Sequence, residues 1–307
     1  MQTFRDSKNT LAEIAGKLRA THVLEGSVRR DELHVRLTVQ LIDARTDDHL
    51  WAETYDRPLT DALALQSAVA KEVAQALKVA IGSGASDAPP TTVPAAYDLY
   101  LKARLTTDER DQLKLLDSAL LLDPRFTLAR AARASAAALV LWFDGTRLVE
   151  LAPQARADID RARLEQPGLP EVEVAEGFYT YRVLRDYRAA LVIVDRALAA
   201  NADDVDALLL RALLLRRLGR GEETMAALRR TKELEPGNPN VMSTFGELFR
   251  FFGRYRESIR VLDEAIAGDT PGMAEALAYE RGAAEFQLTG DLGPYAKLVE
   301  STRSGDY

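Results

Sequence analysis

Two short segments, LGRGEET at residues 218–224 and FGRYRES at residues 252–258, decide the fold of the chain. Each joins two stretches in which apolar residues recur at helical spacing. We expect Gly219 and Gly253 to end one helix each, because glycine is the usual residue at a helix end, and we expect Tyr255 to head the helix that follows. The step from the first segment to the second is that of chains that stack helix pairs with a period of about 34 residues, so the segments predict a helical solenoid.

The same period holds upstream in several columns at once. Large apolar residues recur where one helix pair docks on the next, and small residues recur where two helices must approach closely. The apolar columns are Leu184, Leu218, Phe252; Leu191, Met225, Ile259; and Val194, Leu228, Leu262. The small columns are Ala190, Thr224, Ser258 and Ala197, Thr231, Ala265. Clear repeats are therefore expected at residues 171–203, 204–237 and 238–271, with two divergent units before them, an insertion between Arg125 and Pro167, and a partial unit at 272–307.

These columns resemble the tetratricopeptide repeat, in which a Leu-Gly-x-x-Tyr turn joins two helices and a proline closes the unit. Pro124, Pro167 and Pro236 stand where such units close. The resemblance implies a mostly α fold, a tetratricopeptide-type right-handed α-solenoid over residues 94–307. It also implies a non-enzymatic module that binds a protein or peptide in a concave groove lined by the first helix of each pair.

Residues 1–81 have a different pattern, which predicts a small α/β domain. The expected strands are Thr21–Arg29, Leu33–Ile42 and His49–Asp56. Apolar and polar residues alternate along the second, and short polar connections favour an antiparallel three-stranded sheet. Helical spacing over Leu59–Ile81 predicts a helix that covers the apolar face of this sheet. Small residues and paired prolines at 82–93 predict a linker between the two domains.

Three motifs of this domain, THVLEGSVRR at 21–30, VRLTVQLIDA at 35–44 and LWAETYDR at 50–57, resemble the TolB amino-terminal-like domain over about residues 3–80. In bacteria that domain is often followed by tetratricopeptide repeats, at the carboxy-terminal end of a class III adenylate cyclase, a serine/threonine kinase or a winged-helix regulator. The resemblance implies the sensory or output portion of a signalling protein. The alternative is the regulatory region of such a cyclase or DNA-binding regulator, whose N-terminal domain is missing here. Family members begin with elements that have no counterpart ahead of Phe4, so we expect a truncated domain and a chain that is a fragment.

Composition excludes several functions. The chain has 307 residues, a net charge of −7 and no cysteine. Without a basic excess, nucleic acid is not expected as a partner of this portion, and without cysteine no disulfide or thiolate site can form. We see no signal peptide and no apolar stretch long enough to span a membrane, so a cytoplasmic location is expected. No phosphate-binding loop or catalytic motif is found, so the sequence predicts neither an enzyme nor a cofactor.

Two groups of residues in the first domain have two interpretations each. His22, His34 and His49 are the only histidines, and strands could bring them together at a metal, but ordinary exposed histidines are favoured. Trp51, Glu53 and Tyr55 share one strand face; they could form a recognition surface, although we favour a face that the missing half of the domain covers.

The candidate binding site lies in the repeats. Arg182, Arg216 and Arg250 recur at the repeat period on successive first helices, and a row of guanidinium groups favours an acidic peptide or a carboxylate terminus. The predicted groove residues, with the apolar anchors beside this row, are Tyr179, Arg182, Leu213, Arg216, Arg250 and Phe251. The alternative is a solvated helix face in which Glu247 pairs locally. A signalling domain, in the same chain or in another, is the expected wider partner.

Overall fold

The computed structural model describes residues 10, 13, 15–16, 20–30, 34–58, 62–77, 90–106, 108–144, 150–236, 238–267, 273–293 and 295–296. The chain forms two compact units, residues 1–97 and 98–307. At the start of the first, Thr10 and Glu13 form the reciprocal pair of hydrogen bonds expected of a helix-capping box, Thr10 N to Glu13 Oε2 at 2.8 Å and Glu13 N to Thr10 Oγ1 at 3.3 Å.

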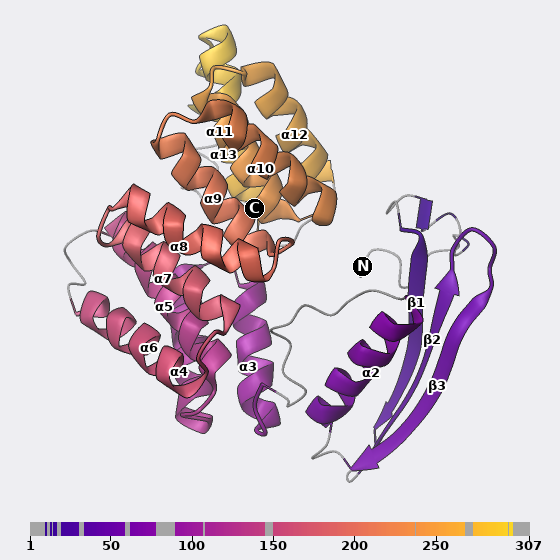
Figure 1. Cartoon of the computed structure of the whole chain (residues 1–307). Helices are drawn as coiled ribbons and strands as arrows, with labels where there is room; N and C mark the ends of the chain where they lie inside the picture. Colours follow the sequence, from indigo (N-terminus) through magenta and orange to yellow (C-terminus); the bar gives the residue numbers. More distant parts are fainter. Residues whose placement is uncertain are drawn as a thin grey trace. The chain divides into compact units, whose positions relative to one another are not determined.

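The first unit is built on an antiparallel sheet in the order β1-β2-β3 (Figure 1). Its strands are β1 (His22–Arg30), β2 (His34–Asp43) and β3 (His49–Pro58). The predicted strands are thus confirmed to within two residues at each end. His22 and His49 lie opposite residues 43 and 42 at one end of β2, whereas His34 begins the other end, so the sheet does not gather the three histidines.

Helix α2 (Ala62–Ala76) packs on one face of this sheet, as the helical spacing predicts. Leu65 and Val69 of the helix are buried against Val35 and Val39 of β2. Trp51 and Tyr55 pack against the same cluster, and Tyr55 donates a 2.8 Å hydrogen bond to Glu72 of the helix. Both aromatic residues therefore pack beside α2 and are partly buried, whereas Glu53 on the same strand face is exposed.

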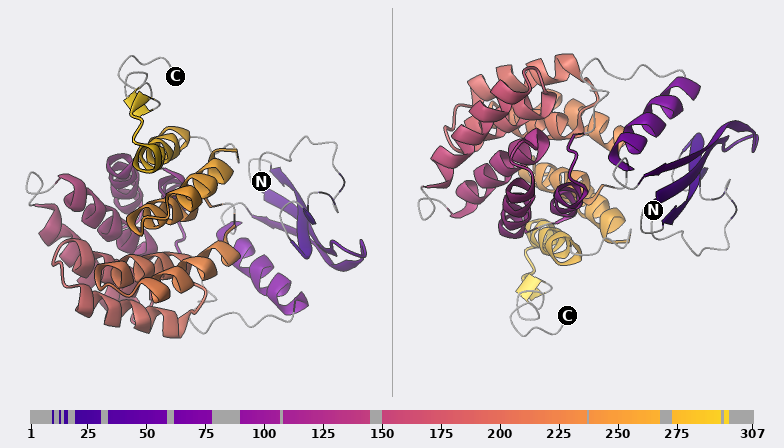
Figure 2. Two further views of the ribbon diagram at one scale, coloured as in Figure 1. Left: turned by 90° about the horizontal axis from the view of Figure 1, so that it is seen from above. Right: turned by 90° about the horizontal axis from the view of Figure 1, so that it is seen from below.

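Every element described after residue 90 is a helix. The bounds are α3 (Pro94–Leu105), α4 (Glu109–Leu122), α5 (Thr127–Asp144), α6 (Leu151–Glu165), α7 (Pro170–Arg182), α8 (Tyr187–Ala200), α9 (Val205–Arg217), α10 (Gly221–Leu234), α11 (Pro239–Phe251), α12 (Tyr255–Ala267) and α13 (Ala274–Thr289). From α5 to α12 the helices pack in consecutive pairs, and Figure 2 shows the pairs following one another around a curved stack. This part of the chain is a tetratricopeptide-type α-solenoid, with α7–α8, α9–α10 and α11–α12 as its three regular repeats. None of the helices described combines the length and apolar character that crossing a membrane requires.

The predicted columns are the contacts between helices. Ala190, Thr224 and Ser258 have no exposed surface, and Ser258 Oγ donates a 2.7 Å hydrogen bond to the carbonyl oxygen of Gly246 on the preceding helix. Val194, Leu228 and Leu262 are fully buried as well. Small side chains here allow close approach, and the large ones fill the space between successive pairs. These two columns are confirmed. In the column of Leu184, Leu218 and Phe252, the last two pack against the core, but the prediction is wrong for Leu184, which is 58% exposed.

The first helix of the 171–203 repeat is out of step by one residue. Asp204 and Asn238, the N-cap residues of α9 and α11, are one full repeat period apart. Leu169, the N-cap residue of α7, precedes Asp204 by one position more than that period. The second helices α8, α10 and α12 begin at the regular period. The turn between α7 and α8 therefore holds one extra residue, and each position in α7 corresponds to a position in α9 that lies one further along than the period indicates.

Candidate peptide-binding groove

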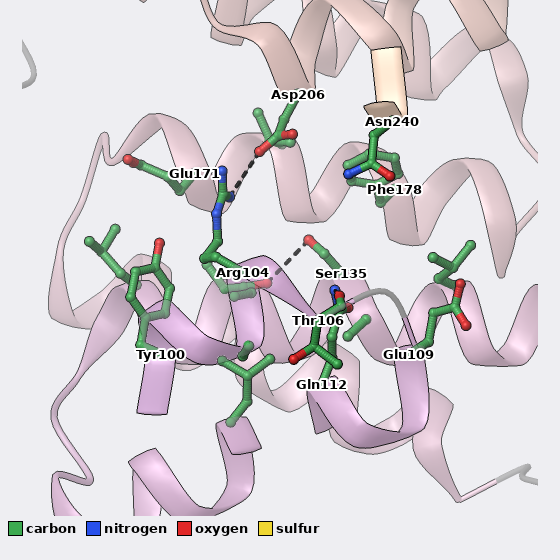
Figure 3. A pocket seen from close by; sticks show the side chains of 18 of the residues that line it. Tyr100, Arg104, Thr106, Glu109, Gln112, Ser135, Glu171, Phe178, Asp206 and Asn240 are labelled. Carbon is green, nitrogen blue, oxygen red and sulfur yellow. Dashed lines mark hydrogen bonds and ion pairs between the residues drawn. The ribbon is translucent and has the colours of Figure 1, made fainter. Parts of the chain in front are cut away.

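A cavity of about 370 Å³ opens on the side of the solenoid formed by the first helices of the pairs (Figure 3). Helices α3, α5, α7, α9 and α11 all contribute to it, together with the start of α4. Because it crosses successive repeats, more than one helix pair supplies its walls.

The floor of the groove is apolar. Leu128, Ala132 and Leu139 lie on one face of α5, since residues spaced by three, four or seven positions share a helix face. Val174 and Phe178 are four residues apart on α7 and face the same cavity. Such a floor provides hydrophobic surface for a ligand. Polar side chains also line the cavity between its ends, among them Gln112 and Ser135 (Figure 3).

One end of the groove is acidic. Arg104 of α3 forms an ion pair of 3.0 Å with Asp206 of α9, and Glu171 lies on the other side of the same guanidinium (Figure 3). Asp204 lines this end too, and its side chain caps α9 by accepting a 2.8 Å hydrogen bond from Ala207 N. Three carboxylates thus lie at this end of the cavity, and the Arg104 guanidinium pairs with the Asp206 carboxylate. Burial raises the pKa of Glu171 above its usual range, and the nearby carboxylate of Asp204 adds to this rise. The pKa of Asp204 is likewise raised, mainly by burial and further by Asp206.

The other end holds Arg182, the last residue of α7. Its guanidinium carbon lies 4.4 Å from the centroid of the Phe178 ring, and the side chain is half-buried. Among the described residues, none forms an ion pair with it; Glu109 at the start of α4 acts on it only from a distance. Burial lowers the pKa of Arg182 to about 10, an effect that Tyr181 and Glu109 offset only in part. A cation that has lost water without gaining a carboxylate is well placed to bind one.

Arg216 and Arg250 lie elsewhere, between α9, α11 and α13. Arg216 is 9% exposed and donates a 2.6 Å hydrogen bond to Glu247. The Nε atom of Arg250 is buried without a hydrogen-bond partner, and the nearby Glu280 has a pKa raised to about 7, chiefly by burial. Of the six residues predicted for the groove, Arg182 is the one that appears among the described lining residues of this cavity.

The extra residue after α7 explains this separation. Once it is counted, Arg182 corresponds to Arg217 rather than to Arg216, so the three arginines do not occupy equivalent positions. Tyr179 corresponds to the fully buried Leu214 and is itself 7% exposed, packed in the core with Ile159 and Val172. Leu213 packs against the next core cluster, while Phe251 is 60% exposed beside Arg216.

The acidic end was missed from the sequence. Glu171, Asp204 and Asp206 are ordinary first-turn or capping residues of their helices, so nothing in the local pattern marks them as a cluster. Arg104 lies about a hundred positions from its partner Asp206, in the most divergent repeat. Counting from each helix start instead of by a fixed period would have placed Phe178, rather than Tyr179, in the groove.

No family model matches the chain. Over 130 residues it is 34% identical to a Rhizobium meliloti (strain 1021) protein named "Putative adenylate cyclase 3"; this match covers 39% of the chain and 22% of that protein. The chain thus matches less than a quarter of the length of this relative.

Solved structures with similar arrangements include a thermophilic TPR protein of Thermus thermophilus, with a TM-score of 0.49 and 19% identity over 62% of this chain and 95% of the other. PilW, a type IV pilus biogenesis factor, gives a TM-score of 0.45, with 15% identity over 69% of this chain and 94% of PilW. YrrB is described as a TPR protein with an unusual peptide-binding site. Its TM-score is 0.36, with 18% identity over 60% of this chain and 90% of YrrB. All three are similar to this chain at low identity.

The described residues contain no group of three or more His, Asp or Glu side chains that could hold a metal ion. The site therefore consists of an apolar floor, an acidic end and an end with one guanidinium.

Proposed function

We propose that the solenoid is a non-enzymatic module that binds a partner protein through a peptide segment held in this groove. The observation that carries the proposal is the cavity of about 370 Å³, which five successive first helices line with an apolar floor and charged ends. A cavity of this size, lined by both apolar and polar side chains, lies within the range of ligand sites in proteins.

An acidic group on the ligand is supported by Arg182 alone. Its guanidinium faces the groove and lacks a carboxylate among the described residues, whereas the Arg216 guanidinium is already bound to Glu247. We therefore propose that a ligand carboxylate lies beside Arg182 and Phe178.

A substitution that fills the groove tests the proposal. Ala132 is half-buried and lines the cavity, so Ala132→Phe should occupy ligand space. Ala199 of α8 is exposed and does not line the cavity, so Ala199→Phe is the matched control. On an array of pentapeptides with blocked termini, Ala132→Phe should abolish the binding shown by the wild type, and Ala199→Phe should keep it. Equal binding by both variants would place the ligand outside the groove.

We further propose that the module serves a signalling protein, as a sensory or output region. The likeness to the R. meliloti protein supports an adenylate cyclase as the first candidate, and a DNA-binding regulator is the alternative. The three antiparallel strands and the covering helix of the first unit agree with a TolB amino-terminal-like domain, an identification that stays a prediction.

The test exchanges the matching segment of the R. meliloti protein for that of this chain and measures cyclic AMP formation. If the segment is regulatory, the hybrid that carries the segment of this chain should form cyclic AMP at the rate of the unaltered R. meliloti protein. A second hybrid, which carries the solenoid of YrrB instead, should form it at a different rate. The same activity in both hybrids would contradict a regulatory role.

A further inference from the structure

The two ends of the groove differ in charge. This difference restricts the charge pattern of a ligand more than Arg182 does by itself. At one end, Glu171, Asp204 and Asp206 have only Arg104 as a counter-charge among the residues that line the cavity there. At the other end, Arg182 has no ion pair among the described residues, and the Glu109 carboxylate, which also lines the cavity, acts on it only from a distance. Partly buried charges that lack a partner are costly, so each end favours a ligand group of opposite sign.

The distance between the ends follows from α7, which carries a charge at each. Glu171 lies in its first turn and Arg182 is its last residue, a separation of about 16 Å at roughly 1.5 Å per residue. Because the Arg182 guanidinium lies over Phe178, one turn nearer to Glu171, the charged groups can be as close as about 10 Å. An extended peptide advances about 3.3 Å per residue, so three to five residues span this interval.

The space between the ends suits apolar side chains. Leu128, Leu139 and Val174 line it, and Leu209 of α9 lies on the same cavity. The side-chain amide of Asn240 stands at the rim, where it can donate to or accept from a peptide backbone (Figure 3).

We infer that the groove binds an extended peptide segment of mixed charge, with a cationic side chain beside Glu171, Asp204 and Asp206, apolar residues over the floor, and a carboxylate beside Arg182. This inference rests on the proposed function and adds the order of charges along the ligand. It differs from a purely acidic ligand, because a second carboxylate would meet the acidic end and be repelled there.

Four sets of pentapeptides with blocked termini test the inference on the full chain. All have three varied apolar residues in the middle, and their outer residues are Lys and Glu, Glu and Lys, two Lys, or two Glu. At least one mixed set should bind about tenfold more tightly than either like-charged set, since a hydrogen-bonded charge contributes about one order of magnitude in affinity. Both mixed sets are included because either chain direction can satisfy the ends.

Charge reversal then assigns each end. Arg182→Glu should shift the preference to the set with two Lys. Glu171→Lys leaves two carboxylates against two cations at the acidic end, so it should abolish the preference of the mixed sets over the set with two Glu. Arg188→Glu makes the same charge change at an exposed position of α8 outside the cavity and should leave the wild-type order intact. Equal binding of all sets, or a wild-type preference for two Glu, would overturn the inference while the peptide-binding function stood. Binding that Ala132→Phe does not reduce, or no binding of any set, would overturn the proposed function itself.

Discussion

Arg216 Nη1 donates a 2.6 Å hydrogen bond to Glu247 Oε1, and the same guanidinium lies 5.1 Å from the centroid of the Phe251 ring. Arg216 belongs to α9, whereas Glu247 and Phe251 belong to α11, so this contact joins two consecutive first helices. The Arg216 side chain is 8% exposed and that of Glu247 is 38% exposed. An arginine in this setting stabilises the interface between repeats and is poorly placed to receive a ligand.

Replacing Arg216 by Gln should therefore lower the free energy of unfolding by about 1–3 kcal/mol, because the buried stem loses its ring contact and Glu247 loses its cation. Urea denaturation measures the change. Arg230→Gln is the control: Arg230 pairs with Asp203 at 2.6 Å, but both side chains are about half exposed, so less than about 1 kcal/mol is expected. Equal losses in the two variants would show that Arg216 is no more structural than a surface arginine.

The turn between α7 and α8 contains a residue in the left-handed region. Arg185 has φ of +58°, and the corresponding turns of the next repeats hold Gly219 at +73° and Gly253 at +72°. Left-handed backbone costs a residue with a Cβ about 1–2 kcal/mol, which glycine avoids. We expect Arg185→Gly to be more stable than Arg185→Ala by about 1 kcal/mol, even though glycine loses more entropy on folding.

The comparison of these two variants removes a second effect. Both lose the contact of the Arg185 guanidinium with Trp142, at 4.9 Å, so their difference reports the backbone alone. Melting temperatures and urea midpoints give that difference. A more stable Ala variant, the usual result at ordinary backbone angles, would contradict a left-handed turn at this position.

The solenoid was predictable because its packing repeats. Each small residue in the column of Ala190, Thr224 and Ser258 meets the same neighbouring helix, so the same constraint acts once in every repeat. The sheet was predictable for a similar reason, since alternation along β2 reflects one covered and one open face.

The groove was less predictable because its chemistry does not repeat. One additional residue after α7 changes which side chains enter the cavity, and a fixed period cannot detect it. Tyr179 was expected in the groove but lies in the core, while its neighbour Phe178 lines the cavity. The pair Arg104 and Asp206 joins distant repeats whose approach depends on the curvature of the whole array.

The solenoid should fold without the first unit. A chain that begins at residue 90 keeps the whole of α3, which starts at Pro94, and every helix after it. Repeat arrays are held together by contacts between neighbouring repeats, so no distant element is needed for stability. Circular dichroism should show a helical spectrum, and heating should give one cooperative transition. A chain beginning at residue 107 lacks α3 and is expected to melt at lower temperature, because the buried Ala103 and the contact of the Tyr100 ring with Phe126 are then lost. An unfolded product from residue 90 onward would contradict the boundary.

Glu280 should make the stability of the solenoid depend on pH. Its Oε1 accepts a 3.1 Å hydrogen bond from Ser243 Oγ, and its Oε2 is buried without a partner. Burial raises its pKa from 4.5 to about 7; the Glu247 carboxylate adds to the rise, while Ser243 and the Arg250 guanidinium oppose it. Below about pH 4.5 the group is protonated in both the folded and the unfolded chain. Between that pH and about 7, the unfolded chain has released a proton that the folded chain retains, so the free energy of unfolding falls as pH rises.

Glu280→Gln removes this dependence, because Gln keeps the shape of the protonated acid and cannot ionise. The variant and the wild type should be about equally stable at pH 5. At pH 8 the variant should be more stable by on the order of 1–3 kcal/mol, since one pKa unit corresponds to about 1.4 kcal/mol and Glu280 is only partly shielded from water. Urea denaturation at the two pH values measures both differences. Glu275→Gln, at an exposed position of the same helix, should show no such change with pH. A variant whose advantage is the same at pH 5 and pH 8 would show that Glu280 ionises alike in the folded and unfolded chain, and a loss of stability at both would mean that its carboxylate forms a contact which the amide cannot replace.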